Sequence, residues 1–249
     1  MTPEAICFHR VFEPAGAAEF RMDRHYLLYA SEGTLRLEAD GQSWTLPPAR
    51  AAFIPAGQSV MVSIRSRLVS ASVLFAPDHY SGLPEGLTVF DMSPLARELI
   101  AECLLPQTEA GPLAPYAKCL FDTLAVVVSR LAENPSLCVL PLPRSAPLLR
   151  ALTLTQEQFA GKPDFETIAR ATGQSSRSLA RRFAEEMGIT WRDTLRRIRV
   201  IHAVELLAAS DRAITDIALD VGYGSVSAFN AAFRAVMGKT PSEYRTTFR

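Results

Sequence analysis

The strongest constraint on this 249-residue sequence is an internal repeat that spans Phe165 to Arg245. Each copy predicts a short helix, a glycine turn and a second helix that begins after a serine N-cap. That arrangement is a helix-turn-helix, whose second helix can enter a DNA major groove. The two copies are offset by 49 positions up to the turn glycine and by 50 after it. The matched pairs are Ile168 and Ile217, Ala169 and Ala218, Gly173 and Gly222, Ser175 and Ser225, Leu179 and Phe229, and Phe183 and Phe233.

The distribution of charge agrees with the repeat. The formal net charge is zero, but residues 1–143 carry 10 Lys/Arg and 15 Asp/Glu, whereas residues 144–249 carry 16 Lys/Arg and 11 Asp/Glu. Of those 16 basic residues 14 are arginine, the side chain best suited to phosphate and guanine. The asymmetry predicts a basic nucleic-acid module joined to an acidic domain of another kind.

The amino-terminal part has the pattern of a small β-barrel or sandwich from about residue 7 to residue 76. Short apolar runs, rich in β-branched and aromatic residues, alternate with turn signals such as Asp40-Gly41, which fits a tight hairpin. The runs cover residues 26–30, 34–38, 43–46, 51–54 and 70–75. Regular spacing of many short strands favours a closed or doubled sheet.

Helices follow these strands at about residues 93–132. Ser93-Pro94 is an N-cap followed by a proline at the first helical position. A second helix over 114–132 has an apolar stripe that would form a dimer surface or pack on the strands. Four prolines then mark 135–147 as a linker. We therefore expect an α+β multidomain protein: residues 1–134 as a β-barrel with trailing helices, and residues 148–249 as an all-α domain of two helix-turn-helix units joined by a long helix.

The two second helices differ in the residues available to read bases. On the first, Arg177 and Arg181 share a face away from the core positions, and arginine can bond bidentately to guanine O6 and N7. In the second copy these positions hold Ser227 and Ala231. Ser227 and Asn230 offer lighter base contacts, so the first copy should carry more of the specificity.

Phosphate contacts are expected from helix N-termini and from further basic or hydroxyl side chains. The alternative is that the basic side chains are only solvated. The candidates are Ser175, Arg182, Arg196, Ser225, Arg234, Lys239 and Thr240, with Arg197 and Arg199 as further basic residues on the long helix.

The second copy resembles the AraC/XylS family of transcriptional regulators. The resemblance covers about the last hundred residues and implies a double helix-turn-helix that regulates transcription. Ala231 stands where the family commonly has arginine. The matching residues are Ile214, Ile217, Ala218, Gly222, Tyr223, Ser227, Phe229, Phe233, Arg234, Gly238, Thr240, Pro241, Tyr244 and Arg245.

The amino-terminal part resembles, less specifically, the cupin-like domain that precedes this module in many members of the family. The resemblance rests on residues 24–30, 44–48 and 53–57. In such proteins the barrel binds an effector or supports dimerisation. The candidate pocket residues are Arg24, His25, Tyr29, Trp44 and Phe53; the alternative for each is a place in the core.

A metal-dependent cupin enzyme is the competing hypothesis. Such enzymes hold a metal with two or three histidines and a carboxylate, but the four histidines here form no His-x-His and no close pair. We therefore expect no enzymatic activity, no metal and no cofactor. A DNA binder without sequence preference is a third hypothesis, which competition between random and promoter DNA would test.

The expected partners follow from this interpretation. They are double-stranded promoter or operator DNA, a small-molecule effector, a second copy of the chain, and RNA polymerase if the protein activates. The four cysteines are dispersed without a CxxC spacing, and no apolar run approaches 18 residues. We expect free thiols, no contact with a membrane and a cytoplasmic location.

Overall fold

The computed structural model describes residues 3–48, 50–80, 82–104, 112–136 and 138–246. The chain divides into two compact units. The first runs from the amino terminus to Leu37 and resumes over Leu46–Ser136, and the second joins Glu38–Thr45 to Leu137–Thr246. Each unit is described by itself.

The strands form two five-stranded sheets, in which the pairs β1–β8, β3–β8, β3–β6, β6–β9, β2–β7 and β5–β10 are antiparallel. The first sheet has the order β1-β8-β3-β6-β9 and the second the order β10-β5-β4-β7-β2. Asp40 and Gly41, with φ of 50° and 71°, form the tight turn between β4 and β5. The bounds are β1 (Ala5–Phe12), β2 (Ala15–Phe20), β3 (His25–Glu32), β4 (Leu35–Ala39), β5 (Gln42–Leu46), β6 (Arg50–Ile54), β7 (Val60–Ile64), β8 (Leu68–Phe75), β9 (Thr88–Asp91) and β10 (Val139–Pro141).

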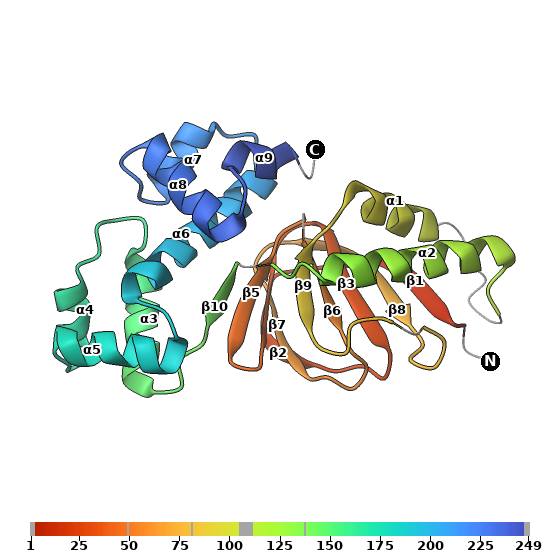
Figure 1. Cartoon of the computed structure of the whole chain (residues 1–249), viewed down its shortest axis with the longest axis horizontal. Helices are drawn as coiled ribbons and strands as arrows, with labels where there is room; N and C mark the ends of the chain where they lie inside the picture. The colour runs from red at the N-terminus through yellow and green to blue at the C-terminus, as the bar shows by residue number, and fades with distance from the viewer. Residues whose placement is uncertain (1–2, 49, 81, 105–111, 137, 247–249) are drawn as a thin grey trace. The chain divides into compact units, whose positions relative to one another are not determined.

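Strand β8 is buried along its whole length because both faces of its sheet are covered. Alternate side chains of β3 and β8 point to one face, where Leu27, Tyr29, Val73 and Phe75 pack with residues of two helices. These helices are α1 (Pro94–Cys103) and α2 (Pro115–Ala132), which Figure 1 shows together on one side of the strands of the first unit.

The apolar stripe of α2 belongs to this core. Phe121, Leu124 and Val128 are fully buried, and Phe121 lies edge-on to the ring of Phe75 at 6.4 Å between centroids. Of the two alternatives for the stripe, the structure shows the packing on the strands. A homodimer would need another surface, such as the outward side of α2 around Val126, whose exposed fraction is 70%.

The second unit contains the remaining helices, and Figure 1 shows the long α6 between the group α3–α5 and the group α7–α9. The two helix-turn-helix units joined by a long helix are confirmed. Strand β10 lies inside the stretch expected to be a linker and pairs with β5. The domains 1–134 and 148–249 remain our proposal, with 135–147 as a connection that contains a strand. The helical segments are α3 (Ala146–Gln158), α4 (Phe165–Ala171), α5 (Ser176–Arg182), a π-helical turn η1 (Phe183–Met187), α6 (Trp191–Ala209), α7 (Ile214–Asp220), α8 (Val226–Met237) and α9 (Pro241–Thr246).

The two sides of α2 generate a stability prediction. Leu124→Ala should lower the free energy of unfolding of the first unit by about 2–5 kcal/mol, because a fully buried leucine leaves a cavity. Val126→Ala, two residues away on the exposed side, should change it by about 0.5 kcal/mol or less. Hydrogen exchange of the β3 and β8 amides measures both values. Equal effects of the two substitutions would contradict the packing described for α2.

Candidate nucleic-acid interface

The first helix-turn-helix is built from local capping signals. Asp164 caps α4 by accepting a hydrogen bond from the Thr167 amide, and Ser175 caps α5 by accepting from the Ser178 amide. The Thr167 hydroxyl also donates to the Asp164 carboxylate, and these bonds lower the pKa of Asp164. Gly173 adopts a φ of 70° in the turn, a conformation that costs an L-residue about 1–2 kcal/mol.

The second helix-turn-helix repeats this plan with one more turn residue. Ser225 caps α8 through the Ala228 amide, and Gly222 adopts a φ of 89°. Gly222 is tightly packed, because an added Cβ would lie 2.7 Å from the Ala160 carbonyl oxygen and 3.0 Å from that of Phe159. By contrast, a Cβ at Gly173 would meet nothing within 4 Å.

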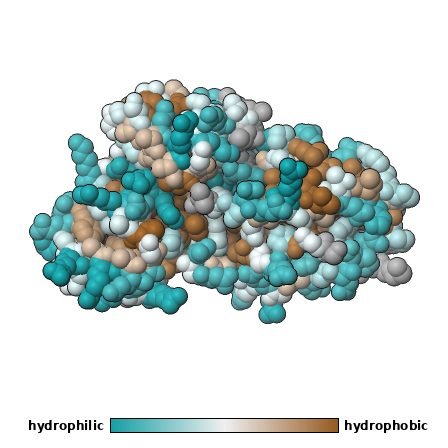
Figure 2. All heavy atoms as spheres, in the orientation of Figure 1, coloured by the Kyte–Doolittle hydropathy of each residue, from teal (hydrophilic) through white to brown (hydrophobic). Residues whose placement is uncertain are grey.

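Helix α5 separates an apolar face from a basic face. Leu179 and, in the turn that follows, Phe183 are fully buried. Arg177 and Arg181 are exposed on another side of the helix, as the sequence predicts. Arg181 lies 3.7 Å from the Glu185 carboxylate, and within the described ranges Arg177 has no ion-pair partner. Figure 2 shows hydrophilic side chains gathered over α4 and α5.

Helix α8 has the same buried face but a different outer face. Phe229 and Phe233 are fully buried, with their rings edge-on at 5.7 Å between centroids. Ser227 and Ala231 are exposed and Asn230 is half-buried. The outer face of α8 is therefore small and uncharged where that of α5 carries two arginines.

The candidates for phosphate contact fall into two groups. Ser175 and Ser225 use their hydroxyls as N-caps, at helix ends where free backbone N–H groups remain. The others are engaged at the surface in bonds that are weak in water. Arg182 lies 3.4 Å from Glu186, Arg196 3.0 Å from Asp193 and Arg234 3.8 Å from Glu243, the Thr240 hydroxyl donates to Glu243, and the Lys239 ammonium lies over the Tyr244 ring at 5.8 Å.

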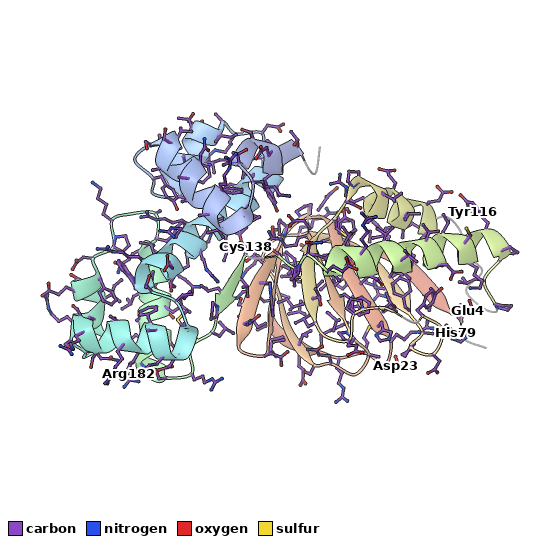
Figure 3. The ribbon with its side chains drawn as sticks, viewed as in Figure 1. Glu4, Asp23, His79, Tyr116, Cys138 and Arg182 are labelled. Carbon is purple, nitrogen blue, oxygen red and sulfur yellow. The ribbon has the colours of Figure 1, made fainter. Side chains whose placement is uncertain are left out.

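Figure 3 labels Arg182, which belongs to the end of α5. Its partner Glu186 also accepts hydrogen bonds from the Ser145 hydroxyl and from the Arg144 and Ser145 amides. These bonds, led by that of the Ser145 hydroxyl, lower the pKa of Glu186. Glu186 thus ties the end of the first recognition helix to the start of α3.

Two arginines of α6 have internal roles that the sequence does not reveal. Arg197 donates to the Val139 carbonyl oxygen at 2.7 Å. Arg199 donates to the carbonyl oxygens of Phe159 and Gly161, both at 2.8 Å, and its guanidinium lies 5.3 Å from the Tyr223 ring centroid. Of the further basic residues expected on this helix, these two are therefore used within the unit.

Four of the five expected effector residues lie on the face of the first sheet that the helices cover or at its ends, and the fifth, Trp44, lies in β5 of the second sheet. Tyr29 and Phe53 pack against α1 and α2, because period-two alternation points them away from the second sheet. His25 stacks on Phe53 at 5.5 Å and accepts a hydrogen bond from the Ala56 amide. Arg24 donates to the Pro3 carbonyl oxygen, and Trp44 is buried in β5 opposite Val139.

A cavity of about 270 Å³ lies instead in the first unit, between β1, β3 and β8 of the first sheet and β2, β4 and β7 of the second. Tyr26 and Leu28, the β3 residues that alternate with Leu27 and Tyr29, contribute to its wall. None of the five expected residues is among the side chains that line it. The cavity and the five predicted residues therefore lie at different places, and the cavity wall includes the other face of β3.

Among the residues that the structure describes, no helix has the length and apolar character needed to cross a membrane. Within the same ranges, no three His, Cys, Asp or Glu side chains are grouped so that they could hold a metal ion.

Comparison with known proteins agrees with the geometry of the helical unit. A family model described as "Helix-turn-helix domain" matches residues 168–247. The chain is 26% identical over 246 residues to the HTH-type transcriptional regulator NimR of Escherichia coli K12, which covers 96% of this chain and 86% of that protein. It is 25% identical over 245 residues to the transcriptional activator RhaS of Citrobacter koseri, and the match covers 91% of this chain and 87% of RhaS. The solved carboxyl-terminal domain of AraT from Geobacillus stearothermophilus is 34% identical, covers 41% of this chain and 86% of that one, and has a TM-score of 0.40.

Two exposed recognition helices on paired helix-turn-helix units, together with these relatives, define a DNA-binding protein that regulates transcription. The carboxyl-terminal helix-turn-helix domain, residues 168–247, is of the AraC type found in transcriptional regulators.

The two turn glycines generate a matched prediction. Gly173→Ala should lower the free energy of unfolding of the second unit by about 1–2 kcal/mol, because alanine is strained in the left-handed conformation. Gly222→Ala should lower this free energy of unfolding by about 1–3 kcal/mol more than Gly173→Ala does, because the new methyl group meets two carbonyl oxygens. Both tryptophans, Trp44 and Trp191, lie in the second unit, so urea unfolding followed by their fluorescence reports this unit. Equal costs would show that the turn at Gly222 does not depend on its contact with the end of α3.

Proposed function

We propose that the protein recognises specific DNA sequences through α5 and anchors itself to the neighbouring major groove through α8. The observation that supports this is the contrast between the two outer faces. Exposed Arg177 and Arg181 offer bidentate donors to guanine. Ser227 and Asn230 offer single hydrogen bonds, so α8 contributes less base specificity.

The phosphate contacts complete this assignment. The N-termini of α5 and α8, behind Ser175 and Ser225, present backbone N–H groups that suit phosphate oxygens. Arg196, Arg234 and Thr240 would exchange intramolecular partners at the surface for phosphate, an exchange that costs little because exposed pairs contribute about 0–1 kcal/mol. Arg182, whose partner Glu186 is half-buried, and Lys239, which lies over the buried Tyr244 ring, would add further phosphate contacts.

We also propose an effector-responsive regulator that is not an enzyme and that works in the cytoplasm, where promoter DNA is accessible. The first unit would receive a small molecule, a second copy of the chain would pair through an outward surface, and RNA polymerase would be a partner if the protein activates. A metal-dependent enzyme is less well supported. Such enzymes usually hold the metal with two or three histidines and a carboxylate, whereas the four histidines of this sequence form no His-x-His and no close pair. Metal analysis of the purified protein tests that alternative.

Arg177→Ala should weaken binding to the selected operator by about 1–3 kcal/mol and relax the base preference at one position. Arg130→Ala is the control, because it removes the same charge from an exposed position on α2, in the other unit. Titration of fluorescent operator DNA at fixed salt, repeated with each base at every position, measures both effects. If Arg177→Ala and Arg130→Ala left the same affinity and the same base preference, Arg177 would not read DNA.

A further inference from the structure

The cavity between the sheets of the first unit has a wall that is almost entirely apolar. One side is formed by β1, β3 and β8 and the other by β2, β4 and β7. Its volume of about 270 Å³ is at the lower end for ligand pockets, so it suits a molecule smaller than most drugs. The apolar lining includes Phe12, Phe20, Leu28, Leu35, Val62 and Ile64.

Buried hydroxyl groups supply the polar part of this wall. Tyr26 and Ser70 line the cavity, and Ser72, two residues along β8, lies 2.7 Å from Ser70 between hydroxyl oxygens. All three residues are buried, and Tyr26 projects from β3 to the same side of the first sheet as the two serines of β8. Burial raises the pKa of Tyr26, so its phenol stays protonated at neutral pH.

The hydrogen bonds of this hydroxyl cluster leave acceptor capacity. The Ser72 hydroxyl donates to the Tyr29 carbonyl oxygen at 3.2 Å, and the Ser70 hydroxyl is within reach of the same oxygen and of Ser72. Each hydroxyl oxygen can accept two hydrogen bonds but donate only one. With their protons shared among the cluster and the Tyr29 carbonyl, Tyr26 and Ser70 retain lone pairs that can accept a proton from a ligand.

The charge at the cavity disfavours an anion. Glu19 is the one charged residue among the lining side chains, and it is exposed, with a hydrogen bond from the Ser59 hydroxyl at 2.6 Å. The Arg10 guanidinium lies over the Phe8 ring, 5.9 Å from its centroid, and neither residue lines the cavity. A carboxylate ligand would lose its hydration, and Arg10, which lies opposite Ser70 in the β1–β8 ladder, is exposed, so solvent screens its charge.

We propose that this cavity binds a small neutral molecule that is mostly apolar and carries one hydroxyl group, an alcohol or a phenol, which donates to the Tyr26–Ser70 cluster. A sugar would leave most of its hydroxyl groups without partners against the apolar wall, at a cost of about 1–3 kcal/mol for each. The proposal names the chemical class of the effector and rests on the proposed regulatory function for its biological meaning.

Strand β2 is the natural entrance. It is the edge strand of its sheet, next to β7, and its ladder is irregular between Ala15 and Ala18. Ala15, Gly16 and Ala18 line the cavity and are exposed to solvent. Short side chains on an irregular edge leave access to the apolar interior without removing the interior strands from the sheet.

Isothermal titration calorimetry of the full chain tests the class with probes of one shape: benzyl alcohol, toluene and benzoate, with xylose as the polyol. Benzyl alcohol should bind at one site, at least tenfold more tightly than benzoate or xylose and more tightly than toluene. Equal binding of benzoate or xylose, or no binding by any of the four, would overturn the proposal.

Two substitutions locate the binding. Val62→Trp should fill the cavity and weaken benzyl alcohol at least tenfold, whereas Met61→Trp, on the exposed side of the same strand, should leave the affinity unchanged. Ser70→Ala should abolish the preference for benzyl alcohol over toluene while toluene itself still binds. If Val62→Trp does not fold, the Ser70→Ala result alone tests whether the probe binds in this cavity. Retained binding in a folded Val62→Trp protein, or an unchanged preference in Ser70→Ala, would place the ligand elsewhere.

Failure of this inference is distinguishable from failure of the proposed function. Operator binding is measured separately, without any probe. A protein that binds its operator but none of the probes disproves only the effector class. One that binds benzyl alcohol but no DNA disproves only the sequence-specific regulator.

Discussion

The bridge made by Arg199 is the interaction on which the DNA-binding unit depends most. From the middle of α6, one side chain donates to two carbonyl oxygens in the segment between α3 and α4 and lies against Tyr223 in the turn of the second helix-turn-helix. Hydrogen bonds from a charged donor contribute about 1.5–3 kcal/mol each. Helix α6 therefore connects the two helix-turn-helix units in two ways: as the covalent link between them and through the contacts of Arg199.

Two neighbouring contacts strengthen this bridge. The Phe159 ring stacks on His202 at 4.1 Å between centroids, with the planes 8° apart. Gly222 brings its backbone against the Ala160 carbonyl oxygen, at a distance that no side chain would permit. The glycine shared by the two copies thus has two reasons to be glycine: in both copies the left-handed turn, and in the second copy also close packing.

Local signals explain why the helical unit is predictable from its sequence. Caps at Asp164, Ser175 and Ser225 are each set by residues within one helical turn, and all three accept an amide hydrogen bond. The repeat then relates the two copies directly. The exposure of Arg177 and Arg181 follows from the burial of Leu179 two positions away.

Long-range contacts explain what the sequence does not reveal. Strand β2 has the sequence Ala-Gly-Ala-Ala-Glu-Phe, which is poor in β-formers, and it is extended because it pairs with β7. The role of Arg199 depends on a loop 40 positions away. For the effector site, period two correctly separates the faces of β3, but the sequence cannot tell which face meets helices and which meets the second sheet.

A rigid pair of recognition helices makes a demand on the spacing of its DNA site, and this spacing is the most direct test. The two half-sites should lie one helical turn apart, about 10–10.5 base pairs. Inserting five base pairs between them turns the second half-site to the opposite face of the duplex. We predict that the full chain loses at least tenfold in affinity and binds the lengthened site no more tightly than DNA that carries the first half-site alone. Equal affinity for the original and the lengthened site would contradict a rigid connection between the two helix-turn-helix units.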